Sequence, residues 1–274
     1  MATPIDKVTT LRVMKKKMRG EKIVCLTAYD YPFARILDEA GVDIILVGDS
    51  VANVVYGMKT TIGIGMDEMV YHTRAVASGV KRALVVSDMP FLSYQVSLEQ
   101  AIENAGRLLK AGAEAVKLEG AGPVLETVRR LVDYGIPVMG HLGLTPQSVH
   151  KLGGYRLQAR RPEEQEKLLT DAQALAAAGC FAIILEKVPA EAASKVTKAL
   201  QIPVIGIGAG PECDGQILVL QDMLGMFEEE PYKFVKRYAE LNRMTRQAVQ
   251  EYVAEVRQGK FPGPEHSFYT DESR

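Results

Sequence analysis

Residues 44–49 read Ile-Ile-Leu-Val-Gly-Asp, a short apolar run that ends in a carboxylate. Three further runs have this form: 83–88 (Ala-Leu-Val-Val-Ser-Asp), 115–119 (Ala-Val-Lys-Leu-Glu) and 181–186 (Phe-Ala-Ile-Ile-Leu-Glu). Continuously apolar, β-branched runs of this length are typical of strands buried on both faces of a parallel sheet. In a parallel barrel the C-terminal ends of the strands converge on one mouth, where the active site lies. We therefore expect several carboxylates to gather there around a bound positive group.

Strand-like runs of this kind recur along the whole chain. They cover residues 22–27, 42–47, 83–86, 115–118, 136–139, 181–185, 203–207 and 216–220. Amphipathic patterns predict helices over 33–40, 66–78, 98–111, 124–134, 162–178 and 189–200. Repeated alternation of strand and helix predicts a parallel sheet with right-handed crossovers. Eight such units predict an α/β fold, a closed (β/α)8 TIM barrel. Because one barrel needs roughly 250 residues and the chain has 274, a single domain over 1–274 is sufficient.

Two connections break the alternation. Residues 208–215 are too few for a regular helix. The Gly-Ile-Gly-Ala-Gly run at 206–210, where this connection begins, suits either phosphate binding or close approach of the backbone to a ligand. Residues 140–161 are rich in glycine and are predicted as a long loop, such as a lid or a binding loop.

The two ends of the chain extend beyond the barrel units. An additional helix over 7–19 is expected to cover the N-terminal end of the barrel. A long final helix is expected over 232–258, with a break near Asn242, and an extended tail over 259–274.

Composition excludes several functional classes. The formal net charge is −1, so neither a nucleic acid nor an anionic membrane is an expected partner. The basic cluster at 12–19 is interpreted as a solvated helix face. The three cysteines form no CxxC pair, which fits a reducing compartment. No signal-peptide core and no uncharged apolar stretch of about 18 residues is found, so we expect a cytoplasmic protein.

Each strand-end acid also suits a simpler structural role. Asp49 fits a turn or helix N-cap, Asp88 an Asx-turn before proline, and Glu186 a surface salt bridge. Joint placement at four strand ends favours one shared site instead. Lys117 and Glu119 are two residues apart on one strand, so both side chains are expected on the same face, inside the barrel.

These residue types indicate a particular chemistry. A set of carboxylate oxygens favours Mg²⁺ or Ca²⁺ over Zn²⁺. Magnesium keeps open positions for substrate oxygens, and one acid is then left as a general base. Of the four histidines, His141 follows the fifth predicted strand and is expected to contact substrate at the same mouth. His72 is expected to pack or cap within its helix, and His150 and His266 to be solvated. Their spacing does not resemble a zinc site.

Eight motifs occur in a fixed order along the chain. They are Thr27-Ala28-Tyr29-Asp30, Val47-Gly48-Asp49-Ser50, Asp88-Met89-Pro90-Phe91, Val116-Lys117-Leu118-Glu119-Gly120, Gly140-His141-Leu142-Gly143-Leu144-Thr145-Pro146-Gln147, Leu185-Glu186 with Val188-Pro189, Ile205-Gly206-Ile207-Gly208-Ala209-Gly210 and Asp214-Gly215-Gln216. Together they resemble the 3-methyl-2-oxobutanoate (ketopantoate) hydroxymethyltransferase family. The likeness runs from about residue 7 to residue 268. The fifth and the last motifs are the most specific to that family.

The resemblance implies a barrel of the phosphoenolpyruvate/pyruvate superfamily type and a role in pantothenate and coenzyme A synthesis. It also implies Mg²⁺, 5,10-methylenetetrahydrofolate as co-substrate and 3-methyl-2-oxobutanoate as acceptor, with a magnesium-stabilised enolate attacking the methylene carbon to give 2-dehydropantoate and tetrahydrofolate. The metal-site acids of the family correspond to Asp49, Asp88 and Glu119. Its ketoacid-binding positions correspond to Asp49, Ser50, Asp88 and Lys117. Its proton acceptor corresponds to Glu186. The family forms homodecamers, so a homo-oligomer is expected.

The chain departs from the family pattern after Ser50. It reads Val51-Ala52-Asn53, Gly57-Met58 and Thr61-Ile62-Gly63-Ile64-Gly65 where many relatives carry other residues. We expect a differently shaped loop beside the site, with an effect on substrate preference.

Two alternatives remain open at this point. A magnesium-dependent 2-oxo acid lyase of the same barrel superfamily shares the strand-end acids, but lyases of that type commonly carry a Lys-Cys-Gly or Lys-Asn-His-like loop, which this sequence lacks. An inactive homologue that serves as a scaffold is expected to have lost some site acids, and all four are present.

Overall fold

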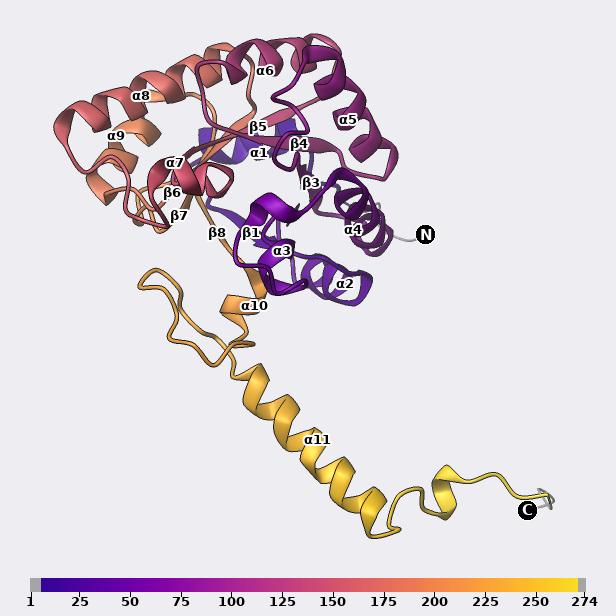
Figure 1. The fold of residues 1–274 in the computed structure, drawn as a ribbon. Coiled ribbons are helices and arrows are strands. Elements are labelled where there is room, and N and C mark those ends of the chain that lie inside the picture. The colour runs from indigo at the N-terminus through magenta and orange to yellow at the C-terminus, as the bar shows by residue number, and fades with distance from the viewer. Residues whose placement is uncertain (1–5, 271–274) are drawn as a thin grey trace. The chain divides into compact units, whose positions relative to one another are not determined.

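Within residues 6–270, the part of the chain that this computed structural model describes, eight parallel strands close into a barrel in sequence order (Figure 1). The strands are β1 (Ile23–Thr27), β2 (Ile44–Val47), β3 (Leu84–Asp88), β4 (Ala115–Glu119), β5 (Val138–Gly143), β6 (Ala182–Glu186), β7 (Val204–Ile207) and β8 (Gly215–Leu218). Pairing of β8 with β1, for example Gly215 with Ile23, closes the ring. The predicted (β/α)8 barrel is confirmed.

Helices surround the strands on the outside of the barrel (Figure 1). They are α2 (Tyr31–Glu39), α4 (Met66–Gly79), α5 (Leu98–Lys110), α6 (Val124–Asp133), α8 (Pro162–Ala177) and α9 (Ala190–Ala199), and a short α3 (Val51–Val54) and η1 (Thr61–Gly63) precede α4. Local sequence fixes their starts. The Ser97 hydroxyl accepts from the Gln100 backbone N–H at 3.2 Å at the N-terminus of α5, and Asp30 caps α2 in the same way.

A further helix, α1 (Thr10–Met18), covers the N-terminal end of the barrel, as predicted. Its Val13 side chain is fully buried and joins the core cluster with Ile23 and Cys25 of β1. An ion pair also anchors this helix, because the Lys17 ammonium lies 2.8 Å from the carboxylate of Asp214. The side chains of α1 therefore complete the apolar core at this end.

The expected loop over 140–161 is only partly a loop. β5 continues to Gly143, so His141 lies within the strand, and η2 (Pro146–Ser148) and α7 (Val149–Leu152) follow it. The prediction of a long loop was therefore wrong for its first half. Residues between β7 and β8 form turns and bends, as the short spacing predicted.

The chain divides into two compact units at Leu220, and the barrel lies in the first. A single domain over 1–274 therefore stays a prediction, and residues 1–5 and 271–274 lie outside the described part. A short helix, α10 (Leu220–Met223), spans the boundary, and the second unit contains α11 (Leu241–Arg257) and η3 (Pro264–His266). The final helix thus begins near the predicted break rather than at residue 232.

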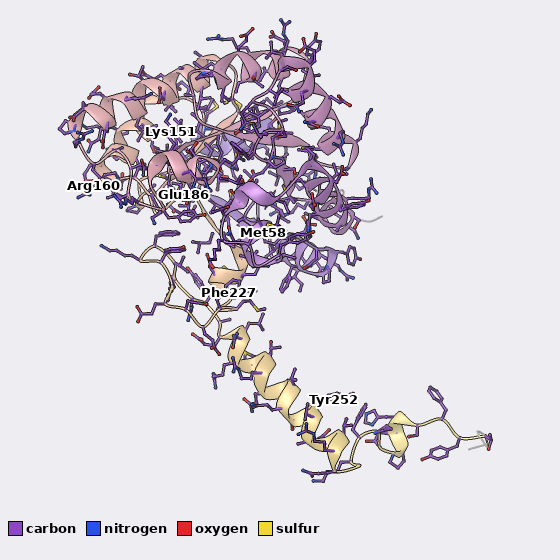
Figure 2. The ribbon with its side chains drawn as sticks, viewed as in Figure 1. Met58, Lys151, Arg160, Glu186, Phe227 and Tyr252 are labelled. Carbon is purple, nitrogen blue, oxygen red and sulfur yellow. The ribbon has the colours of Figure 1, made fainter. Side chains whose placement is uncertain are left out.

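Helix α11 has no buried residue within its own unit. Figure 2 shows Tyr252 on this helix, where the ring is 55% exposed. Among the described residues, none of the helices is both long and apolar enough to cross a membrane.

Candidate functional site

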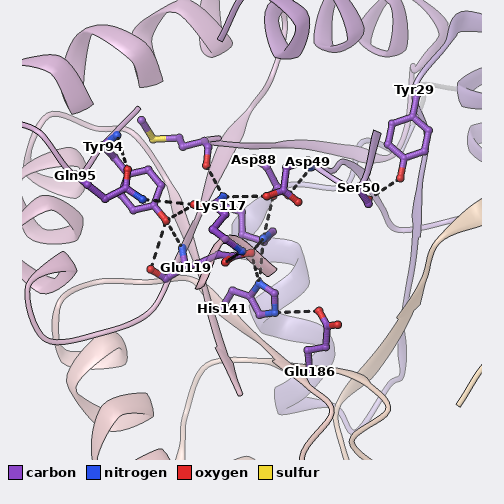
Figure 3. A network of polar contacts seen from close by, with 12 residues as sticks. Tyr29, Asp49, Ser50, Asp88, Tyr94, Gln95, Lys117, Glu119, His141 and Glu186 are labelled. Carbon is purple, nitrogen blue, oxygen red and sulfur yellow. Dashed lines mark hydrogen bonds and ion pairs between the residues drawn. The ribbon is translucent and has the colours of Figure 1, made fainter. Parts of the chain in front are cut away.

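The strand-end acids lie together at the C-terminal end of the barrel, as the sequence predicted (Figure 3). Asp49 is the second residue after β2, whereas Asp88 and Glu119 are the last residues of β3 and β4. All three are buried. Lys117 Nζ lies between two of them, 3.2 Å from Asp88 Oδ1 and 3.7 Å from Glu119 Oε1. The expectation that Lys117 and Glu119 share the interior face is confirmed.

His141 connects this cluster to Glu186, the last residue of β6. Register places His141 beside Glu119 on the neighbouring strand. Its Nδ1 lies 3.3 Å from Glu119 Oε1 and 3.1 Å from Lys117 Nζ, and its Nε2 lies 3.4 Å from Glu186 Oε2 (Figure 3). Glu186 is the more accessible acid, because 16% of its side chain is exposed.

Opposing influences act on the pKa of His141. Burial and the neighbouring Lys117 lower the pKa, but the carboxylates of Glu119 and Glu186 outweigh them and raise it to about 9. The ring Nδ1 lies within reach of both Lys117 Nζ and Glu119 Oε1, and the raised pKa favours the protonated imidazole at neutral pH. His141 thus lies between two carboxylates that stabilise its protonated form.

The acids themselves are crowded. Burial, together with the charges of Asp88 and Glu119, raises the pKa of Asp49 to about 8. Burial likewise raises the pKa of Asp88. Burial also acts to raise the pKa of Glu119, but His141 and Lys117 outweigh it, so this pKa is lowered. Asp49 therefore lacks a positive partner of its own.

The donor set fits a hard divalent cation. Asp88 Oδ1 and Glu119 Oε1 are buried and accept no hydrogen bond. Buried carboxylate oxygens without donors are costly unless a charge neutralises them. Within residues 6–270, no three His, Cys, Asp or Glu side chains are grouped so as to hold a metal ion unaided. Mg²⁺ does not need a full set of protein ligands, because it binds through one or two carboxylates and retains several waters.

Ser50 lies beside Asp49, and its hydroxyl is 2.8 Å from the Tyr29 hydroxyl. Gly48 makes this corner compact, because a Cβ at that position would lie only 2.7 Å from Ser50 Oγ and 3.7 Å from Asp88 Oδ2. Tyr29 belongs to the first motif of the sequence, and burial raises the pKa of its phenol above the usual range. The buried phenol fixes the orientation of the Ser50 side chain.

Comparison with known proteins places this geometry in a family. The family model described as Ketopantoate hydroxymethyltransferase matches residues 7–264. The chain belongs to this family. Two similar proteins, from Syntrophotalea carbinolica and Moorella thermoacetica, are each 56% identical, over 261 and 264 residues that cover 95% and 96% of this chain and 98% of each relative. Both are named 3-methyl-2-oxobutanoate hydroxymethyltransferase. The chain is accordingly an enzyme, a hydroxymethyltransferase, and the resemblance inferred from the motifs is confirmed.

Solved structures confirm the barrel type of this hydroxymethyltransferase. A phosphonopyruvate hydrolase matches with a TM-score of 0.61 at 13% identity, over 94% of this chain and 92% of that chain. A 2,3-dimethylmalate lyase, described as a PEP mutase/isocitrate lyase superfamily member, matches with a TM-score of 0.60 at 16% identity, over 93% and 92%. At these identities the likeness concerns the fold alone.

Sequence reasoning missed two residues of the hydroxymethyltransferase site. Gln147 stands at the end of the Gly-His-Leu-Gly-Leu-Thr-Pro-Gln motif, but no role was inferred for it. Its side-chain Nε2 donates to Asp49 Oδ2 at 3.0 Å, and its Oε1 accepts from the Tyr94 hydroxyl at 2.8 Å. A polar residue at the end of a specific motif was the signal available for Gln147. No comparable signal marked Tyr94.

The glycine run after β7 has a packing explanation in this hydroxymethyltransferase. A Cβ at Gly206 would lie 2.9 Å from Cys213 Sγ, and one at Gly210 would lie 2.5 Å from the Cβ of Ala190. Both positions require glycine for close contact with neighbouring elements. The expected role in binding a ligand stays a prediction.

Proposed function

We propose that this enzyme transfers a hydroxymethyl group from 5,10-methylenetetrahydrofolate to 3-methyl-2-oxobutanoate, giving 2-dehydropantoate and tetrahydrofolate. Family membership supports ketopantoate hydroxymethyltransferase activity in the pantothenate pathway. The observation that carries the proposal is the joint placement of three buried acids, Lys117 and a His141–Glu186 pair at one end of the barrel. Such a site suits an anionic oxo acid that must lose a proton beside its keto carbon.

In this proposal Asp49, Asp88 and Glu119 hold Mg²⁺, directly or through water. When bound, the ion supplies Lewis-acid polarisation of the keto group. The oxygens of Asp88 and Glu119 that accept no hydrogen bond support this assignment. One structural neighbour, phosphonopyruvate hydrolase, is described in a complex with oxalate and Mg²⁺, which supports a dicarbonyl ligand and a cation in a barrel of this type.

Lys117 and Ser50 are proposed to bind the ketoacid oxygens directly. Asp49 and Asp88 are proposed to bind them through the cation. The ammonium of Lys117 is 3% exposed and supplies a buried positive charge for an anionic ligand. Ser50 offers a hydroxyl group, and the hydrogen bond between its Oγ and the Tyr29 hydroxyl, at 2.8 Å, fixes its orientation. We also assign a substrate oxygen to His141, since its protonated ring faces the same space.

Glu186 is proposed as the general base. Its carboxylate takes the proton from C3, and the electron pair of the broken C–H bond forms the enolate. The methylene carbon is bonded to two folate nitrogens, so two C–N bonds break. One breaks as the enolate carbon forms the new C–C bond, and the other breaks as the oxygen of one water forms the hydroxyl group. The proton from C3 and the proton left from water go to the two nitrogens, which gives tetrahydrofolate. His141 Nε2 lies 3.4 Å from the Glu186 carboxylate. A positioned base of this kind contributes roughly 10²–10⁴-fold to the rate.

Location and assembly are also proposals. A cytoplasmic location fits the lack of a disulfide framework in the sequence. A homo-oligomer, a homodecamer by family resemblance, is proposed for the assembly.

The test is an assay of purified enzyme with 3-methyl-2-oxobutanoate and methylenetetrahydrofolate, with Mg²⁺ and with excess chelator. We expect 2-dehydropantoate only when all three are present. Cleavage of an oxo acid without folate would indicate the related lyase activity instead. Full activity in chelator would refute the metal assignment, and absence of both turnover and Mg²⁺ binding would indicate an inactive scaffold.

A further inference from the structure

Each of the three buried acids has one carboxylate oxygen fixed by an N–H group. Asp88 Oδ2 accepts from the Asp49 backbone at 2.9 Å. Glu119 Oε2 accepts from the Gln147 backbone at 3.0 Å, and Asp49 Oδ2 accepts from the Gln147 side chain at 3.0 Å. Two of these three donors therefore belong to one residue, Gln147, which is itself 5% exposed.

The second oxygens behave differently. Asp88 Oδ1 and Glu119 Oε1 accept no hydrogen bond, and their described partners are ion-pair contacts at 3.2 Å or more with Lys117 or His141. The fixed oxygens define the rotation of each carboxylate, and the remaining oxygens are free to meet a cation. This division is what a pre-organised oxygen site requires.

The amide of Gln147 has a single allowed orientation. Its Nε2 meets the Asp49 carboxyl group and, at 2.9 Å, the Met89 carbonyl, which can only accept. Its Oε1 must then accept from the Tyr94 hydroxyl, whose oxygen in turn accepts from the Glu119 backbone N–H at 3.2 Å. Gln147 thus bonds Asp49 through its side-chain amide and the Glu119 carboxylate through its backbone N–H, and Tyr94 links the amide back to Glu119.

We propose that Gln147 is a positioning residue that aligns Asp49 and Glu119 for the cation, with Tyr94 fixing its amide. The inference rests on the proposed magnesium site and adds the residue that organises it. η2, which carries Gln147, accordingly acts as a fixed support of the site. Loss of such an outer partner typically weakens metal affinity roughly 10- to 100-fold.

The test replaces the amide while keeping its length. Gln147→Met removes the side-chain donors and acceptor but leaves the backbone N–H that serves Glu119. Mg²⁺ binding to the full chain is measured by calorimetry without substrates, alongside the melting temperature of the metal-free protein. We expect the Kd for Mg²⁺ to rise roughly 10- to 100-fold. Gln173→Met, the same change at an exposed position of α8, is the matched control and should leave the Kd unchanged.

The outcomes separate the two proposals. If wild-type enzyme binds no Mg²⁺, the metal site of the proposed function fails, and this inference with it. If wild type binds and Gln147→Met binds equally well, the positioning role is refuted while the proposed function stands, even if the variant melts earlier. If Gln147→Met does not fold, Tyr94→Phe provides the test, because it keeps the ring and the amide but frees Oε1. A smaller loss of affinity supports the inference, and an unchanged Kd overturns it.

Discussion

Replacement of Glu186 by glutamine should separate substrate binding from proton removal. The side chain is 16% exposed, and its nearest described charged partner is His141 at 3.4 Å. Glutamine keeps the shape and still offers an oxygen to the imidazole, so the fold and ketoacid affinity should be retained. Loss of a general base lowers the rate roughly 10²–10⁴-fold, which corresponds to about 3–5 kcal/mol in the barrier.

The assay is exchange of the C3 proton of 3-methyl-2-oxobutanoate in D₂O, followed by NMR with Mg²⁺ present and folate absent. Exchange reports the base alone, because no C–C bond forms. We expect exchange to be lost in Glu186→Gln, while calorimetry shows the ketoacid still binding. Glu191→Gln, at an exposed position in the first turn of α9, is the control and should exchange at the wild-type rate. Normal exchange in Glu186→Gln would falsify the assignment of the base.

Three further predictions concern metal removal, backbone space and stability. In metal-free enzyme Asp49 keeps its proton up to a pH of about 8, whereas an unfolded Asp ionises near ~4. Unfolding therefore releases a proton, so the melting temperature in EDTA should fall as the pH rises between these two pKa values. Mg²⁺ should restore the melting temperature most at the alkaline end of this range. A melting temperature in EDTA that does not change with pH would contradict this. Gly143→Ala, at φ +87°, would bring a Cβ to 2.3 Å from the Glu186 backbone oxygen, so stability should fall by about 1–3 kcal/mol in urea denaturation and C3 exchange should slow. Asp214→Asn removes the 2.8 Å ion pair with Lys17. The free energy of unfolding should fall by about 1.5–3 kcal/mol in the same urea denaturation assay, and kcat should be unchanged. An unaltered denaturation midpoint would show that the ion pair contributes nothing to stability.

Buried strands were predictable because apolar runs of this kind have few other stable environments. The extent of β5 was not. The apolar run stops at Met139, and Gly140 and His141 do not continue it, yet the strand extends to Gly143. Pairing with β4 and β6 on both sides satisfies the backbone of these residues, and this tertiary context overrides local preference.

The acids and Lys117 were predictable because strand ends and a period of two locate them without knowledge of distant contacts. The role of Gln147 was not, because its partner Asp49 is 98 residues away. Similarly, the start of α11 depends on contacts outside the helix. The Leu241 N–H donates to the Leu224 carbonyl at 2.9 Å, and a helical pattern over 232–240 does not encode that contact.

Helix α1 has a kinetic consequence. With Val13 packed into the core, α1 covers one end of the barrel, and we expect ligands to reach the site from the opposite end of it. Asp88 and Lys117 lie deep in it, at 2% and 3% side-chain exposure. In the proposed reaction we therefore expect the small ketoacid to bind before the bulkier folate. We expect ordered kinetics, in which a high concentration of a folate analogue slows both entry of the ketoacid and escape of the product.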